Sequence, residues 1–303
     1  MTFLLSAQET AARLPYGALA AQVRATLADA AVQVPERLVQ PLPGGGSLFV
    51  MPAMDGRIAI AKLITHTPGN AGTGRPVIQG DVVVFDTATG QRKFILDGPT
   101  VTARRTAAVS LVAAQALAPH QPGPLLIVGA GVQGRAHLEA FAEGLPLSQV
   151  FIASRNMDSA RALADYAATL GLRAGAVTDA NAALADCPLV VTATPANAVV
   201  LDAIARADAF IAAVGAYTPR MVELSADLCR HCARHGRIVV DTPQAVHEAG
   251  DLLQAGLEVG VFATLREVLA GTAPAVNCGP VLFKSCGWAG WDLAAARTVM
   301  GSV

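Results

Sequence analysis

Positively charged side chains stand in otherwise apolar stretches of the first third of the chain. Arg37 lies in VPERLVQP, Lys62 interrupts the strand-like run RIAIAKLITH, and Arg104 and Arg105 begin an Ala-rich segment. A small acid in a dry pocket needs fixed cations, because an unpaired buried anion is costly. These residues are therefore candidates for binding a carboxylate, although a strand lysine such as Lys62 could instead extend to solvent or form a structural ion pair.

A glycine-rich turn provides a second kind of chemistry. It follows the apolar run PLLIV, precedes a helical segment, and consists of Gly129, Ala130, Gly131, Val132, Gln133 and Gly134. In a strand–turn–helix context the first glycine allows the tight turn and the second lets a pyrophosphate approach the backbone. The third permits close packing of helix on strand. This pattern predicts a dinucleotide site, with the anion bound by the helix N-terminus.

The residues after the next strand indicate which dinucleotide is bound. NAD-binding sites place an acid there for the ribose 2′-hydroxyl, whereas an arginine accommodates a 2′-phosphate. Here the strand FIA is followed by Ser154, Arg155 and Asn156, with no carboxylate. We therefore expect NADP(H), with NADH as a weaker alternative; Arg155 could instead be a solvated residue at a helix start.

Later strand ends should complete the cofactor site. Ligands of open α/β sheets bind at the carboxyl ends of the strands. The runs VVTATPA and AAVGAYTP end in this way, and the residues concerned are Thr194, Pro195, Val214 and Gly215. We expect them to lie along the nicotinamide half of the cofactor.

The elements that must position these residues fall into two groups. Residues 6–31 have helical spacing broken near Pro15, and four strand-like runs joined by short turns follow, so those strands must be antiparallel. An Ala-rich helix over 99–118 ends at a Pro-Gly break. Beyond it buried strands alternate with helices, which is typical of a doubly wound parallel sheet of Rossmann type. The fold class is therefore α/β, with an added α+β antiparallel-sheet domain.

The domain boundaries follow from this change of character. We assign residues 1–119, together with 285–303, to the domain that carries the candidate carboxylate-binding cations, and residues 120–284 to the NADP(H)-binding domain. The segment 279–303 is expected to hold a turn and a final amphipathic helix.

The composition excludes several classes of protein. The chain has 303 residues, of which 53% are hydrophobic and 15% charged, so a disordered chain is excluded. A net charge of -1 gives no electrostatic footprint for nucleic acid or an anionic membrane. The N-terminus lacks the basic lead of a signal peptide, no apolar run reaches membrane-spanning length, and five cysteines form no disulfide framework. A cytoplasmic location is expected.

Over nearly its whole length the sequence resembles the ornithine cyclodeaminase/mu-crystallin family. The resemblance is carried by the RTAA helix start followed by GAGVQG, and by the segments PERLVQP, FVMPAM, IAKLITHTPGN, QGDVVVFDTATG, VGAYTPRMVEL and LFKSCGWAGWDLAAA. It implies a Rossmann domain and an antiparallel-sheet domain that makes a homodimer. The family's carboxylate-binding residues fall on Arg37, Lys62 and Arg105, and Ser285 matches a position near the cofactor.

One departure from the family pattern distinguishes among its activities. Cyclodeaminases carry GGDCPG, whose aspartate acts as base and amine ligand, whereas this chain has Tyr217 at that position in GAYTP. A tyrosine with a pKa near ~10 replaces neither role. The family's ketimine reductases also lack that aspartate. The resemblance therefore implies reduction of 1-pyrroline-2-carboxylate to L-proline, and of 1-piperideine-2-carboxylate to L-pipecolate.

A mechanism and its alternatives follow from these residues. Arg37, Lys62 and Arg105 would hold the ring carboxylate with the C=N carbon against the nicotinamide, while His66, Tyr217 or solvent protonates the imine nitrogen. Alternatives are an alanine-dehydrogenase-like activity, ornithine cyclodeamination, or a non-catalytic protein of mu-crystallin type that binds NADPH and a ligand. The sequence Cys229-Arg230-His231-Cys232 is expected to be a coincidence on a helix, and we expect no metal.

Overall fold

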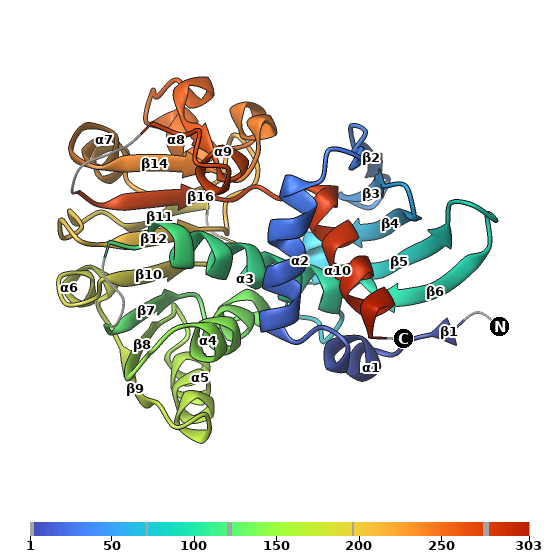
Figure 1. Cartoon of the computed structure of the whole chain (residues 1–303). Helices are drawn as coiled ribbons and strands as arrows, with labels where there is room; N and C mark the ends of the chain where they lie inside the picture. The colour runs from blue at the N-terminus through green and yellow to red at the C-terminus, as the bar shows by residue number, and fades with distance from the viewer. Residues whose placement is uncertain (1–2, 71, 120–122, 196, 275–278, 303) are drawn as a thin grey trace. The chain divides into compact units, whose positions relative to one another are not determined.

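The computed structural model describes residues 3–70, 72–119, 123–195, 197–274 and 279–302 (Figure 1). The chain divides into two compact units. Unit 1 comprises residues 1–109 and 288–303, and unit 2 comprises residues 110–287. The first crossing lies within the Ala-rich helix, before the Pro-Gly break that the sequence suggested. The second lies at Gly287–Trp288, just before the last helix.

Unit 1 is built on a six-stranded sheet. Its order is β1-β6-β5-β4-β3-β2, and its strands are β1 (Phe3–Leu4), β2 (Leu38–Leu42), β3 (Gly46–Met54), β4 (Ile58–His66), β5 (Ile78–Asp86) and β6 (Arg92–Asp97). From β2 to β6 each strand pairs with the next in antiparallel fashion, and β1 adds to β6 in parallel. Short turns leave no room for a parallel return, which explains the antiparallel order.

Three helices and a single-turn element accompany this sheet. They are α1 (Ala7–Ala12), α2 (Tyr16–Ala28), α10 (Ala289–Gly301) and the 3-10 helix η1 (Pro68–Asn70). Pro15 separates α1 from α2 and stands at the N-cap of α2. The last helix, α10, packs along α2 and against β3 and β4, as Figure 1 shows. One face of the sheet is thereby buried, and Ile60, Lys62 and Ile64 of β4 point toward it.

Unit 2 contains a parallel sheet of eight strands in the order β15-β14-β16-β12-β10-β7-β8-β9. The strands are β7 (Leu125–Val128), β8 (Gln149–Ala153), β9 (Arg173–Val177), β10 (Leu189–Thr192), β12 (Phe210–Ala213), β14 (Arg237–Val240), β15 (Ala263–Thr264) and β16 (Val281–Lys284). The chain starts in the middle at β7, adds β8 and β9 on one side, then crosses to β10 and β12. Because such crossovers are right-handed, this reversal places helices on both faces. The predicted doubly wound sheet is confirmed.

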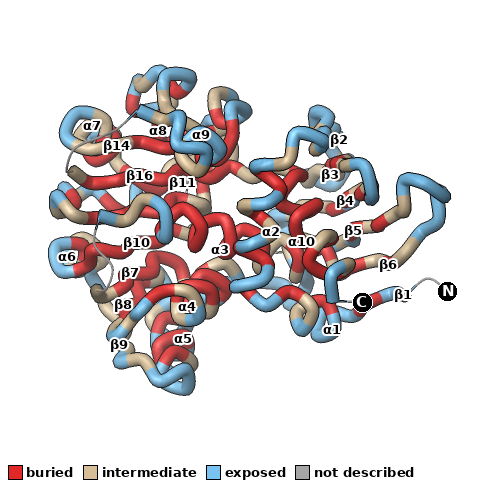
Figure 2. Tube along the Cα trace, in the orientation of Figure 1, coloured by how far each residue is buried: buried red, intermediate tan, exposed pale blue. Residues whose placement is uncertain are grey.

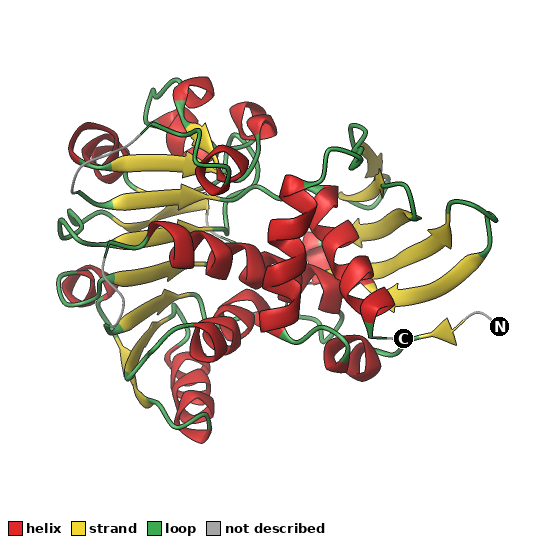
Figure 3. Ribbon diagram, in the orientation of Figure 1, coloured by secondary structure: helices red, strands yellow, loops and turns green. Residues whose placement is uncertain are grey.

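The remaining elements of unit 2 connect these strands. They are α4 (Val132–Gly144), α5 (Met157–Thr169), α6 (Ala180–Leu184), α7 (Ala226–His235), α8 (Gly250–Gln254), α9 (Leu265–Leu269), the 3-10 helices η2 (Pro243–His247) and η3 (Val259–Val261), and the parallel pair β11 (Asn197–Leu201) and β13 (Val222–Leu224). The helix α3 (Gly98–Leu117) begins in unit 1 and ends in unit 2. Figure 3 separates helices from strands, and Figure 2 shows that the parallel strands form the buried centre of this unit.

The strands β1, β2, β9, β11, β13, β15 and β16 were not among the runs expected from the sequence, and β16 is the one that matters most for the site. The segment 279–303 was expected to hold only a turn and a helix, but β16 lies between β12 and β14, with its register set by Phe210↔Val281 and Arg237↔Val281. A run of four residues carries too little periodicity to distinguish a buried strand from a loop. Its place is decided by pairing with strands far back in the sequence. No helix among the described residues has both the length and the apolarity needed to cross a bilayer.

Candidate functional site

The glycine-rich turn joins β7 to α4 in the form a pyrophosphate site requires. Gly129 has φ +116°, and a Cβ there would lie 2.5 Å from the Ala193 carbonyl oxygen. A Cβ on Gly134 would lie 1.8 Å from the Gly129 carbonyl oxygen, so only glycine permits this close turn. In contrast, a Cβ on Gly131 would meet no atom within 4 Å. The side of the turn that a phosphate would approach is therefore open, and Gly131 caps α4 without a side chain.

This turn lies where the strand order of the sheet reverses. Its strand, β7, is flanked by β8 and β10, and crevices at such a switch point bind ligands in open α/β sheets. Ala130 and Gln133 are partly buried, whereas Val132 is 73% exposed at the first helical position. Backbone hydrogen bonds tie the neighbouring loops together, because Gly129 N donates to the Ala153 oxygen and Ala193 N to the Val128 oxygen. The geometry thus fits a dinucleotide.

A buried glutamate holds the ends of β10 and β12. Glu223, the middle residue of β13, accepts four hydrogen bonds. The donors are Thr192 Oγ1 at 3.0 Å, Thr194 N at 2.6 Å, Thr194 Oγ1 at 2.9 Å and Gly215 N at 2.7 Å. Glu223 is completely buried. A Cβ on Gly215 would lie 2.2 Å from the Thr194 oxygen and 2.5 Å from Glu223 Oε1. Glu223 therefore fixes two of the predicted cofactor residues, and it was not identified from the sequence.

Further ionic contacts extend this network. Asp251 Oδ1 accepts from the amides of Glu223 and Leu224 at 2.6 and 2.9 Å, and Asp251 Oδ2 lies 2.8 Å from Lys284 Nζ. Burial lowers the pKa of Lys284, but Asp251 and Glu223 outweigh it and hold that pKa above its ordinary value. Lys284 therefore remains charged as the structural counter-ion of two carboxylates.

The other predicted residues of the nicotinamide half occupy the same sheet edge. Val214, partly buried, donates its amide to the Thr192 oxygen, and Pro195 is exposed after β10. Ser285 follows β16 and donates its hydroxyl to Asp241 Oδ2 at 2.9 Å, and this oxygen also accepts from Cys286 N and Gly287 N. Its hydroxyl proton is thus used within the turn, and contact with a cofactor stays a prediction.

The end of β8 is free of carboxylates, as the sequence indicated. Arg155 is exposed and Ser154 partly buried. Asn156 is the N-cap of α5, because its Oδ1 accepts from Asp158 N at 2.9 Å and Ser159 N at 3.1 Å. The side-chain oxygen Oδ1 of Asn156 therefore stabilises the start of the helix. This leaves the side chains of Ser154 and Arg155 as the groups able to contact a 2′-phosphate.

Unit 1 contains a buried cluster of two cations and one carboxylate. Lys62 on β4 lies 3.0 Å from Asp292 Oδ1 on α10, and Arg105 Nε on α3 lies 3.3 Å from the same oxygen. Their relative exposures are 1%, 0% and 7% for Lys62, Asp292 and Arg105. The other oxygen, Asp292 Oδ2, is buried and has no hydrogen-bond partner among the described residues. The cluster thus carries one net positive charge.

This excess of positive charge bears on the pKa of Lys62. Burial lowers the pKa of Lys62 to about 8; Asp292 opposes that shift, whereas Arg105 and Arg37 contribute to it. Its strand neighbours Met51 and Val82 are uncharged. A carboxylate that bound here would supply the missing negative charge, which is the electrostatic requirement of a substrate acid.

Arg37 and His66, also predicted, lie in the same unit. Arg37 precedes β2, is partly buried, and has its guanidinium carbon 5.9 Å from the centre of the Phe49 ring. His66 ends β4 and points to the same sheet face as Lys62, because side chains alternate along a strand and the two residues are four positions apart. Burial lowers the pKa of His66, so the ring is neutral at pH 7. Arg37, Lys62 and Arg105 are therefore linked electrostatically, while His66 is a weak acid candidate.

The neighbouring arginines at the start of α3 have different roles. Arg104 Nε donates to the Leu14 oxygen at 2.7 Å, and its guanidinium lies 4.0 Å from the centre of the Tyr16 ring. Arg104 is thus used to attach the start of α2, whereas Arg105 joins the buried cluster. Tyr217, which was predicted together with His66 as a possible proton donor, is partly buried in the segment after β12 of unit 2.

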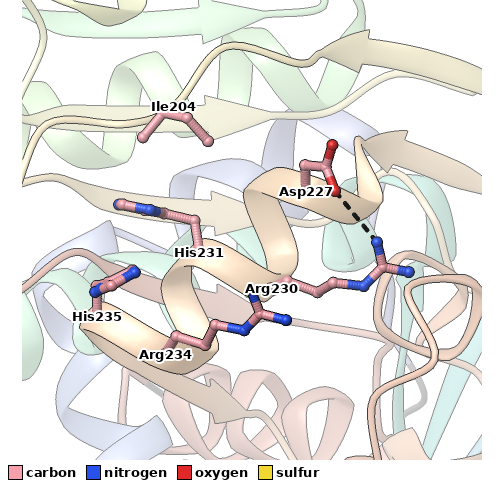
Figure 4. A pocket seen from close by; sticks show the side chains of 6 residues that line it. All are labelled: Ile204, Asp227, Arg230, His231, Arg234 and His235. Carbon is pink, nitrogen blue, oxygen red and sulfur yellow. Dashed lines mark hydrogen bonds and ion pairs between the residues drawn. The ribbon is translucent and has the colours of Figure 1, made fainter.

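A hollow of about 400 Å³ elsewhere on unit 2 is unrelated to these groups. It lies against α7 and is lined by Ile204, Asp227, Arg230, His231, Arg234 and His235 (Figure 4). Arg230 is paired with Asp227 at 3.2 Å, and the rings of His231 and His235 lie 4.8 Å apart. Cys229 and Cys232 point into the core instead, and the described residues contain no group of three or more metal-ligating side chains.

Two residues central to these clusters were not predicted. Asp292 lies in GWAGWDLAAA and Glu223 in RMVELS, where each resembles an ordinary polar residue on an amphipathic segment. A signal was present for Asp292, since it is the one acid in the otherwise uncharged stretch from Ser285 to Ala296. No local signal distinguished Glu223, whose partners lie 8 to 31 residues away.

Comparison with known protein families identifies this architecture. The model of the ornithine cyclodeaminase/mu-crystallin family matches residues 2–303. The chain belongs to this family. It is 41% identical over 301 residues to Delta(1)-pyrroline-2-carboxylate reductase 2 of Burkholderia ambifaria, covering 96% of this chain and 93% of that one.

A second relative has a broader name. The chain is 40% identical to the Delta(1)-pyrroline-2-carboxylate/Delta(1)-piperideine-2-carboxylate reductase of Azospirillum brasilense, over 97% of this chain and 94% of the relative. Relatives named for reduction of cyclic imino acids therefore match this family member over almost the full length of both chains.

Solved structures have the same fold. An archaeal alanine dehydrogenase dimer with bound NAD has a TM-score of 0.89 at 25% identity, covering 99% of this chain and 95% of that one. The Delta(1)-pyrroline-2-carboxylate reductase of Thermococcus litoralis, in complex with NADH and L-proline, has a TM-score of 0.85 at 25% identity, over 98% and 93%. The fold of this family member is thus one that binds nicotinamide dinucleotides.

Proposed function

We propose that this protein is a reductase of cyclic ketimines that uses a nicotinamide dinucleotide, converting 1-pyrroline-2-carboxylate to L-proline. The observation that carries the proposal is the buried cluster in which Lys62 and Arg105 share a single carboxylate, Asp292. Its unbalanced positive charge suits a monocarboxylic acid. Two relatives, 41% and 40% identical over nearly the full chain, are named for reduction of such substrates, which supports the same substrate class.

The chain's own residues would act mainly by binding and orienting the substrate. Lys62 and Arg105, with Arg37, bind the ring carboxylate and so fix the position of the imine carbon. A nicotinamide cofactor, when bound, supplies the hydride that this carbon accepts. The imine nitrogen must carry a proton for this attack. We assign that proton to solvent or to a nearby side chain, with Lys62, His66 and Tyr217 as the candidates.

Cyclodeamination of ornithine is disfavoured by the residue after β12. Tyr217 occupies the position of the cyclodeaminase aspartate, and a phenol neither pairs with an ammonium group as a carboxylate does nor acts as a base near neutral pH. The acid nearest to it in the sequence, Glu223, is buried and accepts four hydrogen bonds from strand ends, so it cannot take over that role.

We propose NADPH as the preferred cofactor, with NADH used more weakly. Supporting this preference, β8 ends without a carboxylate, and the exposed Arg155 stands beside Ser154 at its carboxyl end. Two solved relatives contain NAD or NADH, which makes the ratio of the two cofactors the quantity to measure. The candidate contacts of the pyrophosphate are the backbone groups of Gly129 to Gly134.

We propose that both five- and six-membered imines are reduced, giving L-proline and L-pipecolate. The two rings differ by one methylene, which changes binding in an apolar pocket by only about 1–3 kcal/mol. A relative at 40% identity is named for both substrates.

A homodimer formed through the sheet of unit 1 is part of the proposal. Several large apolar side chains of this sheet are exposed in the single chain, namely Phe3, Leu4, Leu38, Val39 and Leu63, with relative exposures of 61, 71, 56, 43 and 42%. Such a collection is typical of a subunit interface. Cytoplasmic location is likewise proposed, supported by buried cysteines that are free thiols.

Incubation with NADPH and 1-pyrroline-2-carboxylate tests the proposed reaction. Rapid consumption of NADPH with formation of L-proline is expected, and the same assay with 1-piperideine-2-carboxylate tests ring size. Consumption only with pyruvate and ammonia would instead identify an alanine-dehydrogenase-like enzyme, and release of ammonia from ornithine a cyclodeaminase. Tight binding of NADPH without turnover would identify a binding protein of mu-crystallin type.

Sedimentation velocity at several protein concentrations tests the proposed homodimer.

A further inference from the structure

The buried carboxylate of Asp292 has a position that binding of substrate alone does not explain. It lies on α10, near the end of the chain, yet one of its oxygens contacts Lys62 of β4 and Arg105 of α3 at 3.0 and 3.3 Å. Three elements far apart in the sequence therefore meet at one oxygen atom. An acid beside a substrate-carboxylate site should weaken binding by repulsion, so its presence requires a separate reason.

We propose that Asp292 is a positioning residue that keeps Lys62 protonated and aims both Lys62 and Arg105 at the substrate. This inference rests on the proposed function and deepens it, by assigning the control of the cationic site to a residue that does not itself bind substrate. Because one carboxylate serves two cations, one positive charge remains for a monocarboxylate. A second carboxylate here would neutralise the site, and none would leave two buried cations repelling each other.

The charges around Lys62 determine what a change at Asp292 must do. Asp292 faces Lys62 from α10, Arg105 from α3, and Arg37 acts on it from the segment before β2, while its register partners Met51 and Val82 are apolar. Along β4 itself, His66 is neutral at pH 7. Asp292 is the one negative group among these residues. Its removal leaves burial and two cations, all of which favour the neutral amine of Lys62.

A proton-transfer step gives this control a chemical use. The Lys62 ammonium donates a proton from Nζ to the imine nitrogen, whose lone pair forms the new N–H bond, and Lys62 becomes a neutral amine. The iminium carbon would then accept the hydride that a nicotinamide cofactor supplies when bound, which forms the new C–H bond. The π electron pair of the C=N bond becomes the lone pair of the amine nitrogen. Solvent returns a proton to Lys62. Asp292 makes this cycle possible at neutral pH by stabilising the ammonium between turnovers.

The pH dependence of Asp292→Asn tests the proposal. In the wild type, kcat/KM for 1-pyrroline-2-carboxylate should fall above about pH 8, where Lys62 loses its proton. In Asp292→Asn this fall should move to lower pH by about 1–3 units, which is the range for losing an opposite charge at contact distance. Asp292→Glu should restore most of the wild-type profile. If Asp292→Asn folds and its kcat/KM falls at the same alkaline pH as in the wild type, the proposal is overturned.

Two controls separate this result from loss of folding. Asp251→Asn removes the carboxylate that pairs with Lys284, the other buried lysine on a strand. This variant should have a lower melting temperature, but the pH at which kcat/KM falls on the alkaline side should not change. In a Lys62→Met background, Asp292→Asn should have no further effect on the pH profile. If Asp292→Asn fails to fold, the Lys62→Met/Asp292→Asn double variant should fold, because it leaves Arg105 as the one remaining charge of the cluster instead of two cations that repel each other. Failure of both variants, with Asp292→Glu also inactive, would favour a purely structural role.

A binding measurement distinguishes this inference from the proposed function. Calorimetric titration with pyrrole-2-carboxylate, a planar analogue that cannot be reduced, reports the charge of the site without turnover. Its affinity should fall above about pH 8 in the wild type, and at lower pH in Asp292→Asn. Wild-type protein that binds the analogue in this manner but does not consume NADPH would refute the reductase and retain the role of Asp292. Turnover with pH-independent binding in both proteins would refute the role of Asp292 alone.

Discussion

Each unit contains a buried lysine on a strand that is paired with a buried aspartate from a helix. Lys62 of β4 lies 3.0 Å from Asp292, and Lys284 of β16 lies 2.8 Å from Asp251. All four residues have relative exposures of 1% or less. The pKa values of the two lysines are nevertheless shifted in opposite directions. Burial lowers the pKa of Lys62 to about 8, whereas the pKa of Lys284 is raised because its carboxylate neighbours outweigh burial.

The difference lies in the number of carboxylates for each cation. Lys62 shares one aspartate with Arg105, so that cluster has one positive charge more than it needs. Lys284 interacts with both Asp251 and Glu223, whose remaining acceptors receive backbone and threonine donors. Counted as ions, the Lys284 network has one negative charge in excess, which hydrogen-bond donors of the same chain meet, so it stabilises the fold. The excess positive charge beside Lys62 is instead suited to a ligand of negative charge. Geometry alone would have made the two lysines look equivalent.

The largest expected effects come from replacing each lysine with methionine. Lys62→Met should lower kcat/KM by about 10²–10³-fold through loss of a buried charge-assisted contact. Its melting temperature should stay near that of the wild type, because Asp292 keeps Arg105 as its partner. Steady-state kinetics and calorimetry measure the two effects.

The matched variant Lys284→Met should behave in the opposite way. It leaves Asp251 and Glu223 buried without their cation and should lower the free energy of unfolding by about 3–5 kcal/mol, as measured by urea denaturation. Equal losses of stability in Lys62→Met and Lys284→Met would show that both clusters are structural.

Replacement of Arg105 should affect substrate binding without affecting cofactor binding. Arg105→Ala is expected to raise KM for the imine acid by about 10–100-fold, the effect of losing one hydrogen-bonded charge at about 1.5–3 kcal/mol. The Kd for NADPH, measured by its fluorescence, should change little. Arg104→Ala is the control, because Arg104 contacts Leu14 and Tyr16 instead; a wild-type KM in Arg105→Ala would remove that residue from the carboxylate site.

Glu223→Gln tests whether the network around Lys284 serves the cofactor. An amide accepts fewer hydrogen bonds than a carboxylate and brings an NH₂ group toward the donors of Thr194 and Gly215. We expect the Kd for NADPH to rise by about tenfold, equivalent to roughly one lost net hydrogen bond. KM for the imine at saturating NADPH should remain unchanged, and a larger change in that KM than in the Kd would contradict this role.

The smallest effect is expected at the exposed end of β8. Arg155→Ala should narrow the preference for NADPH over NADH by about three- to tenfold, because an exposed ion pair with phosphate contributes about 1 kcal/mol. Arg161→Ala is the matched control, since Arg161 lies on α5, the helix that follows Arg155, and pairs with Asp158. An unchanged cofactor ratio would mean that the 2′-phosphate, if distinguished, is bound elsewhere.

Much of the fold could be predicted from local patterns. The runs LLIV, LVVT and FIAA are buried along their whole length, as parallel strands require, and the turn at Gly129–Gly134 stands between strand and helix. Strand β16 was missed because four residues carry no usable period. The cations Arg37, Lys62 and Arg105 were identified as candidates from their unusual apolar setting, and the family resemblance then selected Arg105 over Arg104.

By itself, the sequence predicted the α/β architecture with its antiparallel addition, the dinucleotide turn and the cations that we propose bind a carboxylate. These depend on hydrophobic period, on glycine's access to positive φ and on charge in apolar surroundings, all of which are local. Tertiary structure alone decided which acids meet those cations. Asp292 is 230 residues from Lys62, and a strand that was not predicted carries Lys284 to Asp251. The net charge around a lysine is a sum over its neighbours in space. The lysine that we propose binds substrate can therefore be distinguished from the structural lysine only in the folded chain.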